Sequence, residues 1–511
     1  MTATEASIVV TLDIGGSAAK ASAYDAARQV CLGQAEAPYP EPQPRADPGL
    51  FDPDGWWLAA IAALHQLQQR LDQPAGRYLG ITVSAIRIPF VLVGADGAAV
   101  MPGLLNNDGR ARGHVEQAAA PLGADGLYRL TGHWPAPVFG LPKLLWTRDR
   151  YPDAWRATRS VLQLHDWFVY RLSGVIASEP SSAAMSQMLD VRGGRWAASL
   201  LDSLNISNAV MPGLAPAGTP AGGLLRSVAE QTGLAAGTPV HIGGGDTHMS
   251  ALSAAAGDGI PVVVAGTTAP VVLAVPAART AGPAEELFPL LVSDHVVAGQ
   301  RVLEANAGAT GSIAMRLGGL TAASGGLLAQ ALASRGFTLE RGGPDEPLTV
   351  LAGHPFFGPS GGASWRPPTV IGLRDSCTGE DVYQACLHGI CLAIRGTLGC
   401  LLRQSGAIAP FIVATGGMSR SPSWAQLLAD VTGTEVRVRP LDRISGRAGA
   451  LVVTGENLPG RHEEGDEHIR VYEPRADVIA EHDAALARYQ LFYRNTQVQG
   501  SGGQVSNAGP R

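Results

Sequence analysis

The sequence predicts an α/β protein built from two related domains. Its 511 residues are too many for one simple core, so two sizeable domains are expected. Residues 8–25 and residues 260–275 each contain a strand pattern, a turn of glycine and hydroxyl residues, and a second strand pattern. This likeness indicates a duplicated unit. We place the boundary near residues 253–260, which gives domains of residues 1–255 and 256–496 and a flexible tail of residues 497–511.

Composition narrows the class of protein. Charged residues make up 16% of the chain, against about 25% in ordinary soluble proteins. The net charge of −6 gives no basic surface for nucleic acid, so small-molecule partners are expected. The N-terminus lacks the pattern of a signal peptide, and no apolar run of about 20 residues predicts a membrane span. Five cysteines without a CxxC pair fit a reduced, cytoplasmic protein.

Local patterns predict the main elements in order. "IVVTLDIGGSAAKASAYD" predicts an N-terminal β-hairpin, and Asp52 followed by Pro53 predicts the start of a helix that continues to about residue 71. "YLGITVSAI" and "FVLVGADG" predict two more strands. In the second half, residues 380–406 show the apolar spacing of one long amphipathic helix.

The first of four glycine-rich sites is "TLDIGGSAAK". Asp13 ends a strand, Gly15, Gly16 and Ser17 turn the chain, and Lys20 follows on the next strand. Backbone N–H groups at such a turn can hold phosphate oxygens, and an aspartate beside them can hold Mg²⁺ through water. A plain hairpin explains the segment equally well.

Three further sites share this character. "VVVAGTTAP" is a turn rich in donors, "ANAGATGSIAMRL" places glycines before a helix pattern, and "VATGGMSRSPSWAQLLADVTG" runs from a strand through Gly-Gly to a capped helix. Taken singly, each is also typical of a tight turn. Their candidate nucleotide-binding residues are Gly266, Thr267, Thr268, Gly311, Gly416, Gly417 and Ser421.

The segment "IGGGDTHMS" presents Asp246 after three consecutive glycines. Such a run loses much conformational freedom on folding and is tolerated where backbone turns sharply or lies against a ligand. His241, Asp246 and His248 could together bind zinc, but no further ligands accompany them, which disfavours a zinc site.

Together and in order, these segments resemble the FGGY carbohydrate kinase family. The resemblance runs from Ile8 to about Tyr493 and is strongest in "IGGGDTHMSALSAAAG", "AGTT", "TGGMSRSPSWAQLLADVTG" and "GRAGALVVTG". "LHDWFVYRLSG" and "SEPSSAAMSQMLDV" add to it. It implies two actin-like (ribonuclease H-like) ATPase domains around an interdomain cleft, with ATP and Mg²⁺ as cofactors.

The resemblance also implies roles for individual residues. Asp246 matches the general base that takes the proton of the attacking sugar hydroxyl, and with Asp13 it would stand near Mg²⁺. Lys20 matches the basic residue of the first phosphate loop, and Thr267 matches a hydroxyl on the nucleotide phosphates. Gly16 departs from the threonine or serine of many members, although Ser17 lies beside it.

The sugar pocket follows the family less closely. In "NNDGR", Asn106 stands where the family has tryptophan, while Asp108 and Arg110 remain. Ile86-Arg87-Ile88 replaces the Gln-Met-His of xylulokinases, but its arginine coincides with one in glycerol kinases. Trp134 is either a polyol contact or a packing residue. The candidate substrate-binding residues are Arg87, Asn107, Asp108, Arg110, Trp134 and Asp246.

The sequence therefore predicts an ATP-dependent sugar kinase. D-Xylulose, giving D-xylulose 5-phosphate, is the first choice of substrate, and ribulose, glycerol and gluconate stay open. The rival class is a non-catalytic nucleotide switch of the actin/Hsp70 type, which Asp246 argues against because a switch needs no sugar-directed base. The expected partners are a small sugar and ATP, without nucleic acid or membrane, and a homodimer is left open.

Overall fold

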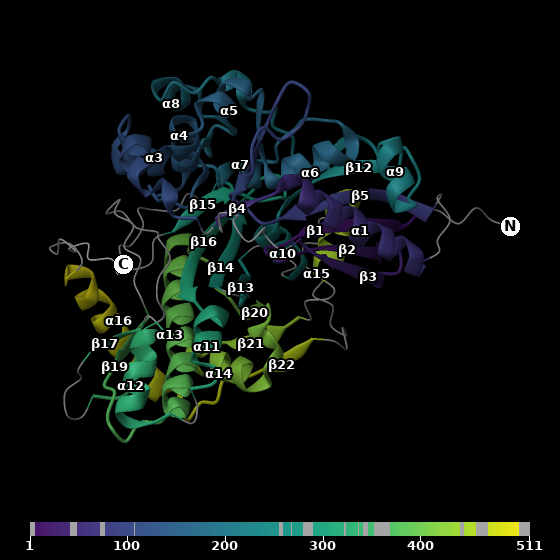
Figure 1. Cartoon of the computed structure of the whole chain (residues 1–511). Coiled ribbons are helices and arrows are strands. Elements are labelled where there is room, and N and C mark those ends of the chain that lie inside the picture. The colour runs from purple at the N-terminus through teal and green to yellow at the C-terminus, as the bar shows by residue number, and fades with distance from the viewer. Residues whose placement is uncertain are drawn as a thin grey trace.

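The fold was analysed in a computed structural model of the whole chain (Figure 1). The structure describes residues 6–40, 49–71, 77–106, 108–254, 259–266, 268–278, 290–320, 323–335, 337–340, 346–351, 368–439, 444–455 and 469–499. Two large sheets organise these residues, one in each half of the chain. In Figure 1 the first half lies above the second, and the helix α10 lies between the two sheets.

The first sheet has six strands in the order β11-β12-β5-β1-β2-β3. β1, β2 and β3 are antiparallel, whereas β5 and β12 run parallel to β1. The predicted N-terminal hairpin is therefore confirmed. The strands are β1 (Ile8–Ile14), β2 (Ala18–Asp25), β3 (Val30–Pro38), β5 (Tyr78–Ala85), β11 (Pro220–Gly223) and β12 (Pro239–Gly245).

The second sheet has seven strands in the order β15-β16-β14-β13-β20-β21-β22. β13, β14 and β16 are antiparallel, and β20 and β21 run parallel to β13. This repeats the pattern of the first sheet and confirms the predicted duplicated unit. The strands are β13 (Pro261–Val264), β14 (Thr268–Pro276), β15 (Leu291–Asp294), β16 (Gln300–Ala309), β20 (Phe411–Thr415), β21 (Glu435–Val438) and β22 (Arg470–Tyr472).

Helices cover both sheets, and the remaining strands form small separate sheets of two or three strands. The first half contains α1 (Pro53–Leu71), η2 (Arg110–His114), α2 (Val115–Ala119), α3 (Gly123–Thr131), α4 (Gly140–Arg150), α5 (Pro152–Ala157), α6 (Leu164–Ser173), α7 (Pro180–Ala184), α8 (Ala198–Ser203), η3 (Asn208–Val210), α9 (Arg226–Thr232) and α10 (Asp246–Ala254). Its small strands are β4 (Leu50–Phe51), β6 (Phe90–Val93), β7 (Gly103–Leu104), β8 (Ser160–Gln163), β9 (Leu189–Asp190) and β10 (Arg195–Trp196).

The second half is completed by α11 (Gly311–Leu317), α12 (Gly325–Ser334), α13 (Gly379–Ser405), η4 (Met418–Arg420), α14 (Pro422–Thr432), α15 (Ile444–Thr454), α16 (Ile479–Gln499), β17 (Thr338–Glu340), β18 (Thr349–Leu351) and β19 (Thr369–Ile371). Within the described ranges, α13 is the one helix with the length and apolar composition to cross a membrane. Of its most apolar stretch, 67% is buried, in the core of the second half.

Helix ends follow the predicted capping chemistry. The hydroxyl of Ser421 accepts a hydrogen bond from the N–H of Trp424 at the start of α14, and Gly433 ends that helix in the left-handed conformation. The predicted helix after Asp52 is α1, and the long amphipathic helix is α13. Of the predicted tail, residues 497–499 belong to α16, and the rest lies outside the described residues.

Helix α15 belongs to the second half by sequence but packs on the first sheet. Ala450 shares an apolar cluster with Val9 and Tyr24, and Ala448 shares another with Met249 of α10. Gly449 makes this packing close, since a Cβ atom there would lie 1.9 Å from the hydroxyl oxygen of Thr11. The helix therefore ties the two halves together.

The three glycines before Asp246 form the end of β12 rather than a loop. A Cβ atom on Gly243 would lie 1.8 Å from the carbonyl oxygen of Val83 in β5, and one on Gly244 would lie 2.4 Å from Val296 of the second half. On Gly245 it would overlap the side chain of Arg87, at 2.6 Å. The glycines thus let β12 end in a space too narrow for any side chain.

We predict that Gly243→Ala destabilises the fold strongly, because the new methyl group meets backbone that cannot turn away. Overpacking of this kind costs ~1–3 kcal/mol or more in the free energy of unfolding. Gly113→Ala is the matched control, since its Cβ would meet nothing within 4 Å. Urea and thermal unfolding would measure both variants, and equal stabilities would contradict the close approach of β12 to β5.

Candidate active site

The parallel strands bring the sequence-predicted carboxylates together at one edge of the first sheet. Asp13 lies near the end of β1, Arg87 follows β5, and Asp246 follows β12 as the first residue of α10. Asp13 and Gly244 both pair with Ser84 of β5 in the strand register. The ends of three neighbouring strands therefore present these groups side by side.

Asp13 is half-buried and accepts a hydrogen bond from the hydroxyl of Ser84 at 2.9 Å. Burial and the negative charge of Asp246 raise the pKa of Asp13 to about 6, against the lowering effects of Ser84 and Lys20. Two carboxylates close enough to affect each other in this way form a set of oxygen atoms that suits a hard cation such as Mg²⁺.

The first glycine turn is exposed between β1 and β2. The N–H of Gly15 donates to the carbonyl of Ala18 at 3.1 Å, and the Tyr39 hydroxyl donates to the carbonyl of Gly15 at 2.9 Å. Gly16 and Ser17 are exposed at the tip. Lys20 lies opposite Asp13 in the register of the hairpin, and its ammonium group is 3.9 Å from Glu36 at the surface.

The structure brings the three predicted nucleotide sites of the second half together. The carbonyl of Gly266 accepts hydrogen bonds from the N–H of Gly311 and the hydroxyl of Thr310, both at 2.9 Å. The N–H of Met418 donates to the carbonyl of Ala265 at 3.1 Å, so the turn after Gly416 also reaches this point. Gly416 has φ of +99°, which only glycine adopts readily.

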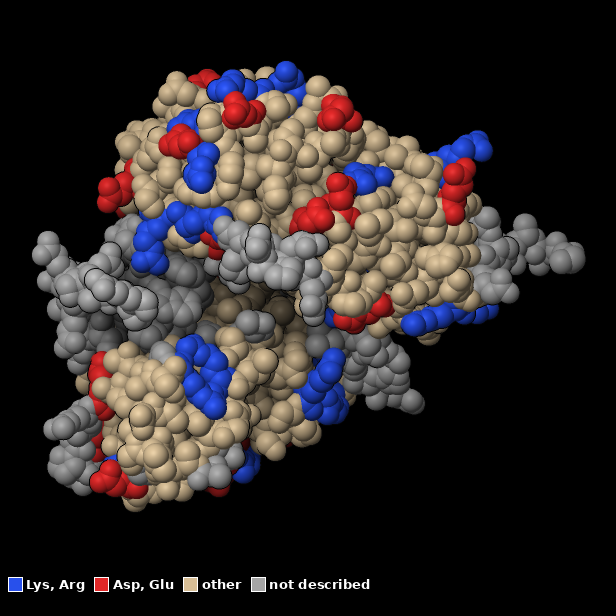
Figure 2. All heavy atoms as spheres, viewed as in Figure 1, with Lys and Arg blue, Asp and Glu red and all other residues tan. Residues whose placement is uncertain are grey.

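The remaining predicted nucleotide residues lie around this junction. Thr268 is half-buried at the start of β14. Gly417 is exposed, with nothing within 4 Å of the position of a Cβ atom, and Ser421 is exposed at the start of α14. Thr267 lies outside the described residues. The sphere view of Figure 2 shows the surface hollowed between the two halves.

Arg87 is bound by a carboxylate from the other half of the chain. Two of its nitrogens lie 2.6 and 2.9 Å from the two oxygens of Glu304 on β16, so the pair is bidentate. Its third nitrogen, Nε, lies 3.7 Å from Oδ1 of Asp246. Arg87 therefore forms a buried link between Asp246 and the second sheet, and its predicted contact with sugar stays a prediction.

Burial and neighbouring groups act in opposite directions on the carboxyl group of Asp246. Burial raises the pKa of its carboxyl group, whereas Arg87 and hydrogen bonds from Thr247 lower it. The backbone N–H of Thr247 donates to Oδ1 at 2.7 Å. Its side chain is still 36% exposed, so a substrate hydroxyl can reach it.

Asp108 and Arg110 bind each other. The Nε atom of Arg110 donates to Asp108 at 2.7 Å, and the guanidinium lies over the ring of Trp146. Lys143, fully buried on α4, donates to the carbonyls of Leu105 and Asn106 at 2.5 and 3.1 Å and so fastens the start of this segment. Asn107 lies outside the described residues.

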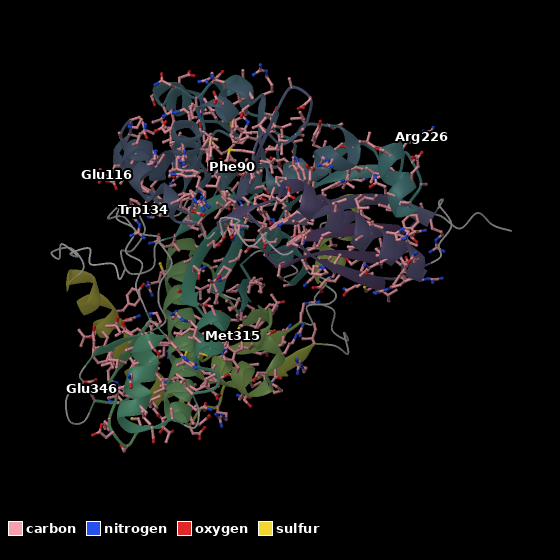
Figure 3. All side chains as sticks on the ribbon, viewed as in Figure 1. Phe90, Glu116, Trp134, Arg226, Met315 and Glu346 are labelled. Atoms are coloured by element: carbon pink, nitrogen blue, oxygen red, sulfur yellow. The ribbon has the colours of Figure 1, made fainter. Side chains whose placement is uncertain are left out.

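Trp134 is buried and stacks on Tyr128 with ring centres 4.4 Å apart. In Figure 3 it lies on the side of the first half that faces the second. Its indole N–H has no hydrogen-bond partner among the described residues. The packing role and the ligand role that the sequence left open for Trp134 are therefore both compatible with its position.

The histidines near Asp246 do not form a metal site. Nε2 of His248 lies 2.9 Å from the hydroxyl of Ser293 on β15, and burial holds the pKa of His248 well below its usual range. His241 instead contacts the carbonyl of Gly218 at 3.1 Å. In the part of the chain that the structure describes, no group of three His, Cys, Asp or Glu side chains is placed to bind a metal ion.

Sequence reasoning missed two groups at this site. His165 accepts a hydrogen bond from the N–H of Gly243 at 3.0 Å and contacts Asp166 at 3.0 Å, so this pair supports the end of β12. The segment "LHDWFVYRLSG" drew attention to these residues without assigning them this contact. Glu304 is the second group, and no local pattern in its strand marks it.

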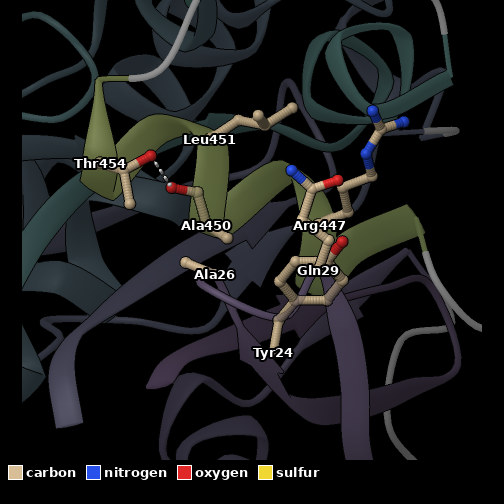
Figure 4. Close-up of a pocket in the computed structure, with 7 residues that line it drawn as sticks. All are labelled: Tyr24, Ala26, Gln29, Arg447, Ala450, Leu451 and Thr454. Atoms are coloured by element: carbon tan, nitrogen blue, oxygen red, sulfur yellow. Dashed lines mark hydrogen bonds between the residues drawn. The ribbon is translucent and has the colours of Figure 1, made fainter. Parts of the chain in front are cut away.

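A small pocket lies elsewhere, between α15 and the end of β2 (Figure 4). Tyr24 on its wall pairs with Val9 near the start of β1, whereas Asp13 lies near the other end of that strand. This pocket is therefore separate from the carboxylates. It is lined by Tyr24, Ala26, Gln29, Arg447, Ala450, Leu451 and Thr454.

Family models match both halves of the chain. The family model described as "FGGY family of carbohydrate kinases, N-terminal domain" matches residues 8–253, and the corresponding C-terminal domain matches residues 261–453. Among curated relatives, the autoinducer-2 kinase of Enterobacter sp. (strain 638) is 26% identical over 510 residues, covering 95% of this chain and 94% of the relative.

Solved structures share the fold over nearly the whole chain. Xylulose kinase from Rhodospirillum rubrum superposes with a TM-score of 0.79 at 24% identity and covers 96% of this chain and 99% of its own. Gluconate kinase from Lactobacillus acidophilus gives 0.77 at 19% identity, with coverages of 97% and 98%. The predicted two-domain actin-like fold is thus confirmed, and the chain belongs to the FGGY family of carbohydrate kinases.

Proposed function

We propose that this carbohydrate kinase transfers the γ-phosphate of ATP to a hydroxyl of a small sugar, with Asp246 as the general base and D-xylulose as the first-choice substrate. The observation that carries the proposal is the placement of Asp246. Its carboxylate lies beside Arg87 and near enough to Asp13 to raise that residue's pKa, at the strand ends of the first sheet. The resemblance of the segment around Asp246 to the family supports this choice of base.

The surroundings of Asp246 suit proton transfer. Burial raises its pKa and so makes the carboxylate a stronger proton acceptor than one in water. Oδ1 is occupied by the N–H of Thr247, which fixes the orientation of the group and leaves Oδ2 for the attacking hydroxyl. Phosphoryl transfer needs this positioning more than covalent help from the protein.

The proposal includes Mg²⁺ bound with the nucleotide, and a cytoplasmic location as the sequence predicts. Asp13 and Asp246 would hold the ion, directly or through water, and the ion would neutralise charge on the phosphates. The glycine turns at Gly15–Ser17 and at Gly266, Gly311 and Gly416 would hold the phosphates and nucleoside through backbone N–H groups.

The substrate is tested by an ADP-release assay across a panel. D-Xylulose is the first choice from the sequence and is supported by the similarity to xylulose kinase structures. Autoinducer-2, the substrate named for the curated relatives, belongs in the panel with D-ribulose, glycerol and D-gluconate. The proposal expects the highest kcat/KM with D-xylulose. A higher value for another compound would replace the substrate, and no sugar-dependent ADP release would favour the nucleotide switch.

We predict that Asp246→Asn lowers kcat by ~10²–10⁴-fold, because the amide keeps the shape of the carboxylate but cannot accept the proton. Nucleotide affinity should change little. Steady-state turnover, binding of an ATP analogue and melting temperature would be measured on one preparation. Asp202→Asn, exposed on α8, is the control and should keep full activity. A folded Asp246→Asn protein with near wild-type turnover would remove Asp246 from the mechanism.

A second prediction concerns the stability of the protein without magnesium. The pKa of Asp13 is about 6 in the folded protein and 3.8 in the unfolded chain. Ionisation of Asp13 therefore destabilises the fold progressively as the pH rises from 3.8 to about 6. Asp13→Asn should therefore melt at a higher temperature than the wild type above pH 6 and at a similar temperature near pH 4. Thermal unfolding in EDTA from pH 4 to 8 would test this. A difference in melting temperature that stays constant from pH 4 to 8 would show that ionisation of Asp13 does not destabilise the fold.

A further inference from the structure

Strand β12 contains a β-bulge near its end. Its register against β5 shifts between His241 and Gly244. Within this interval, Ile242 and Gly243 stand opposite a single residue of β5. An extra residue of this kind bends the strand and changes the face to which the residues after it point. The bulge therefore contributes to the place at which the chain presents Asp246, the first residue after β12.

The backbone groups of the bulge have partners outside the ladder with β5. The N–H of Ile242 donates to the carbonyl of Thr219 at 2.9 Å, and the carbonyl of Ile242 accepts from the N–H of Gly218 at 2.8 Å. The N–H of Gly243 donates to Nε2 of His165 on α6 at 3.0 Å. A buried N–H without a partner is costly, so His165 stabilises the bulge in this form.

We propose that His165 is a positioning residue, which holds the bulge of β12 and thereby fixes the place of Asp246 relative to the substrate hydroxyl. The three glycines before Asp246 have no side chains with which to anchor this end of the strand. Backbone hydrogen bonds therefore hold it, and the bond to His165 acts at the bulge itself. This inference rests on the role of Asp246 proposed above.

Asp166 orients the imidazole of His165. Nδ1 of His165 lies 3.0 Å from Oδ1 of Asp166. Because an amide N–H can only donate, Nε2 of His165 is the unprotonated nitrogen, and Nδ1 carries the proton that Asp166 accepts. Oδ2 of Asp166 accepts from the N–H of Gln163 at 3.1 Å and from the hydroxyl of Ser178 at 2.5 Å. The orientation and the tautomer of the ring are thus both fixed.

The His165–Asp166 pair lies in apolar surroundings. The two side chains are 1% and 0% exposed, and their chain neighbours Leu164 and Trp167 belong to the apolar core of the first half. Burying polar groups among such residues is costly unless they are hydrogen-bonded. An apolar side chain in place of His165 would satisfy the packing, whereas only an acceptor satisfies the N–H of Gly243. The bond to the bulge is therefore what the histidine adds.

The first test compares two substitutions that differ in the acceptor. His165→Leu is apolar and removes it, whereas His165→Gln can place its amide oxygen near the position of Nε2. We expect His165→Leu to lower kcat by ~10–10²-fold, since a misplacement of about 1 Å can cost that much. His165→Gln should recover most of this loss. The affinity for an ATP analogue should change little in either variant, because Gly243 is not among the predicted nucleotide residues.

Hydrogen exchange gives a readout that does not depend on activity. The amide of Gly243 should exchange faster in His165→Leu than in the wild type or in His165→Gln, because it has lost its acceptor. Mass spectrometry of the peptide that contains β12 would measure this. If His165→Leu does not fold, His165→Asn replaces it with the same expectations, since its shorter amide can still bind Asp166 without reaching Gly243.

A matched control removes a buried histidine elsewhere. His482 on α16 contacts His388 on α13 at 3.1 Å, in the second half of the chain. His482→Leu should leave turnover and the exchange of the β12 peptide unchanged. A similar loss of turnover in His482→Leu and His165→Leu would show that the loss follows from removing any buried histidine, and it would overturn the proposal.

A double variant separates positioning from a merely structural role. In the Asp246→Asn background, His165→Leu should cost no further turnover, because the base that His165 positions is already absent. General damage to the fold would lower turnover by a similar factor in both backgrounds and would overturn the proposal. Full turnover of a folded His165→Leu protein, or an unchanged exchange rate of the Gly243 amide, would overturn it as well.

Failure of this inference is distinguishable from failure of the proposed function. If Asp246→Asn is inactive while folded His165→Leu keeps full turnover, Asp246 remains the base and only the positioning role of His165 is wrong. If Asp246→Asn keeps near wild-type turnover, the base proposed above is wrong, and the positioning role of His165 falls with it.

Discussion

The close approach of β12 to β5 is the constraint on which the site depends. Because Gly243 has no side chain, β12 can lie so near β5 that a Cβ atom there would be only 1.8 Å from the Val83 carbonyl oxygen, and the strand can continue parallel to β5 up to Gly245. The chain then enters α10 at Asp246. Any side chain at these positions would displace that carboxylate from its neighbours. The three glycines lose much conformational freedom on folding, and in return they fix the position of Asp246.

Residues of the second half contact the candidate site in the first half. Its glycine turns converge on the carbonyls of Ala265 and Gly266, while Glu304 and Ser293 reach across to Arg87 and His248. Helix α15 crosses back to pack on the first sheet. These contacts make the relative placement of the halves part of the candidate site.

Local sequence patterns predicted much of the fold. The hairpins, the helix after Asp52 and the cap at Ser421 depend on residues close in sequence, and all were predicted. The partner of Arg87 lies 217 residues away, and no local pattern reveals such a contact. The same limit applies to the glycines before Asp246, which the sequence explained by a sharp turn or a nearby ligand: the backbone they pack against is the Val83 carbonyl, which belongs to another strand.

The departure from the xylulokinase pattern has a physical meaning in this arrangement. Both terminal nitrogens of Arg87 bind Glu304, and the side chains of Ile86 and Ile88 are apolar. Nε of Arg87 is therefore the one side-chain donor of this segment that does not bind Glu304. Polar side-chain atoms without partners among the described residues include the indole nitrogen of Trp134 and Oε1 of Gln187. The two are linked, since Gln187 donates to the Trp134 carbonyl at 2.8 Å, and His133 and Arg87 both contact Met185 beside them. Because buried donors and acceptors are costly to leave unpaired, a ligand hydroxyl at these atoms would be stabilised by them, and the role of Trp134 as a polyol contact stays a prediction.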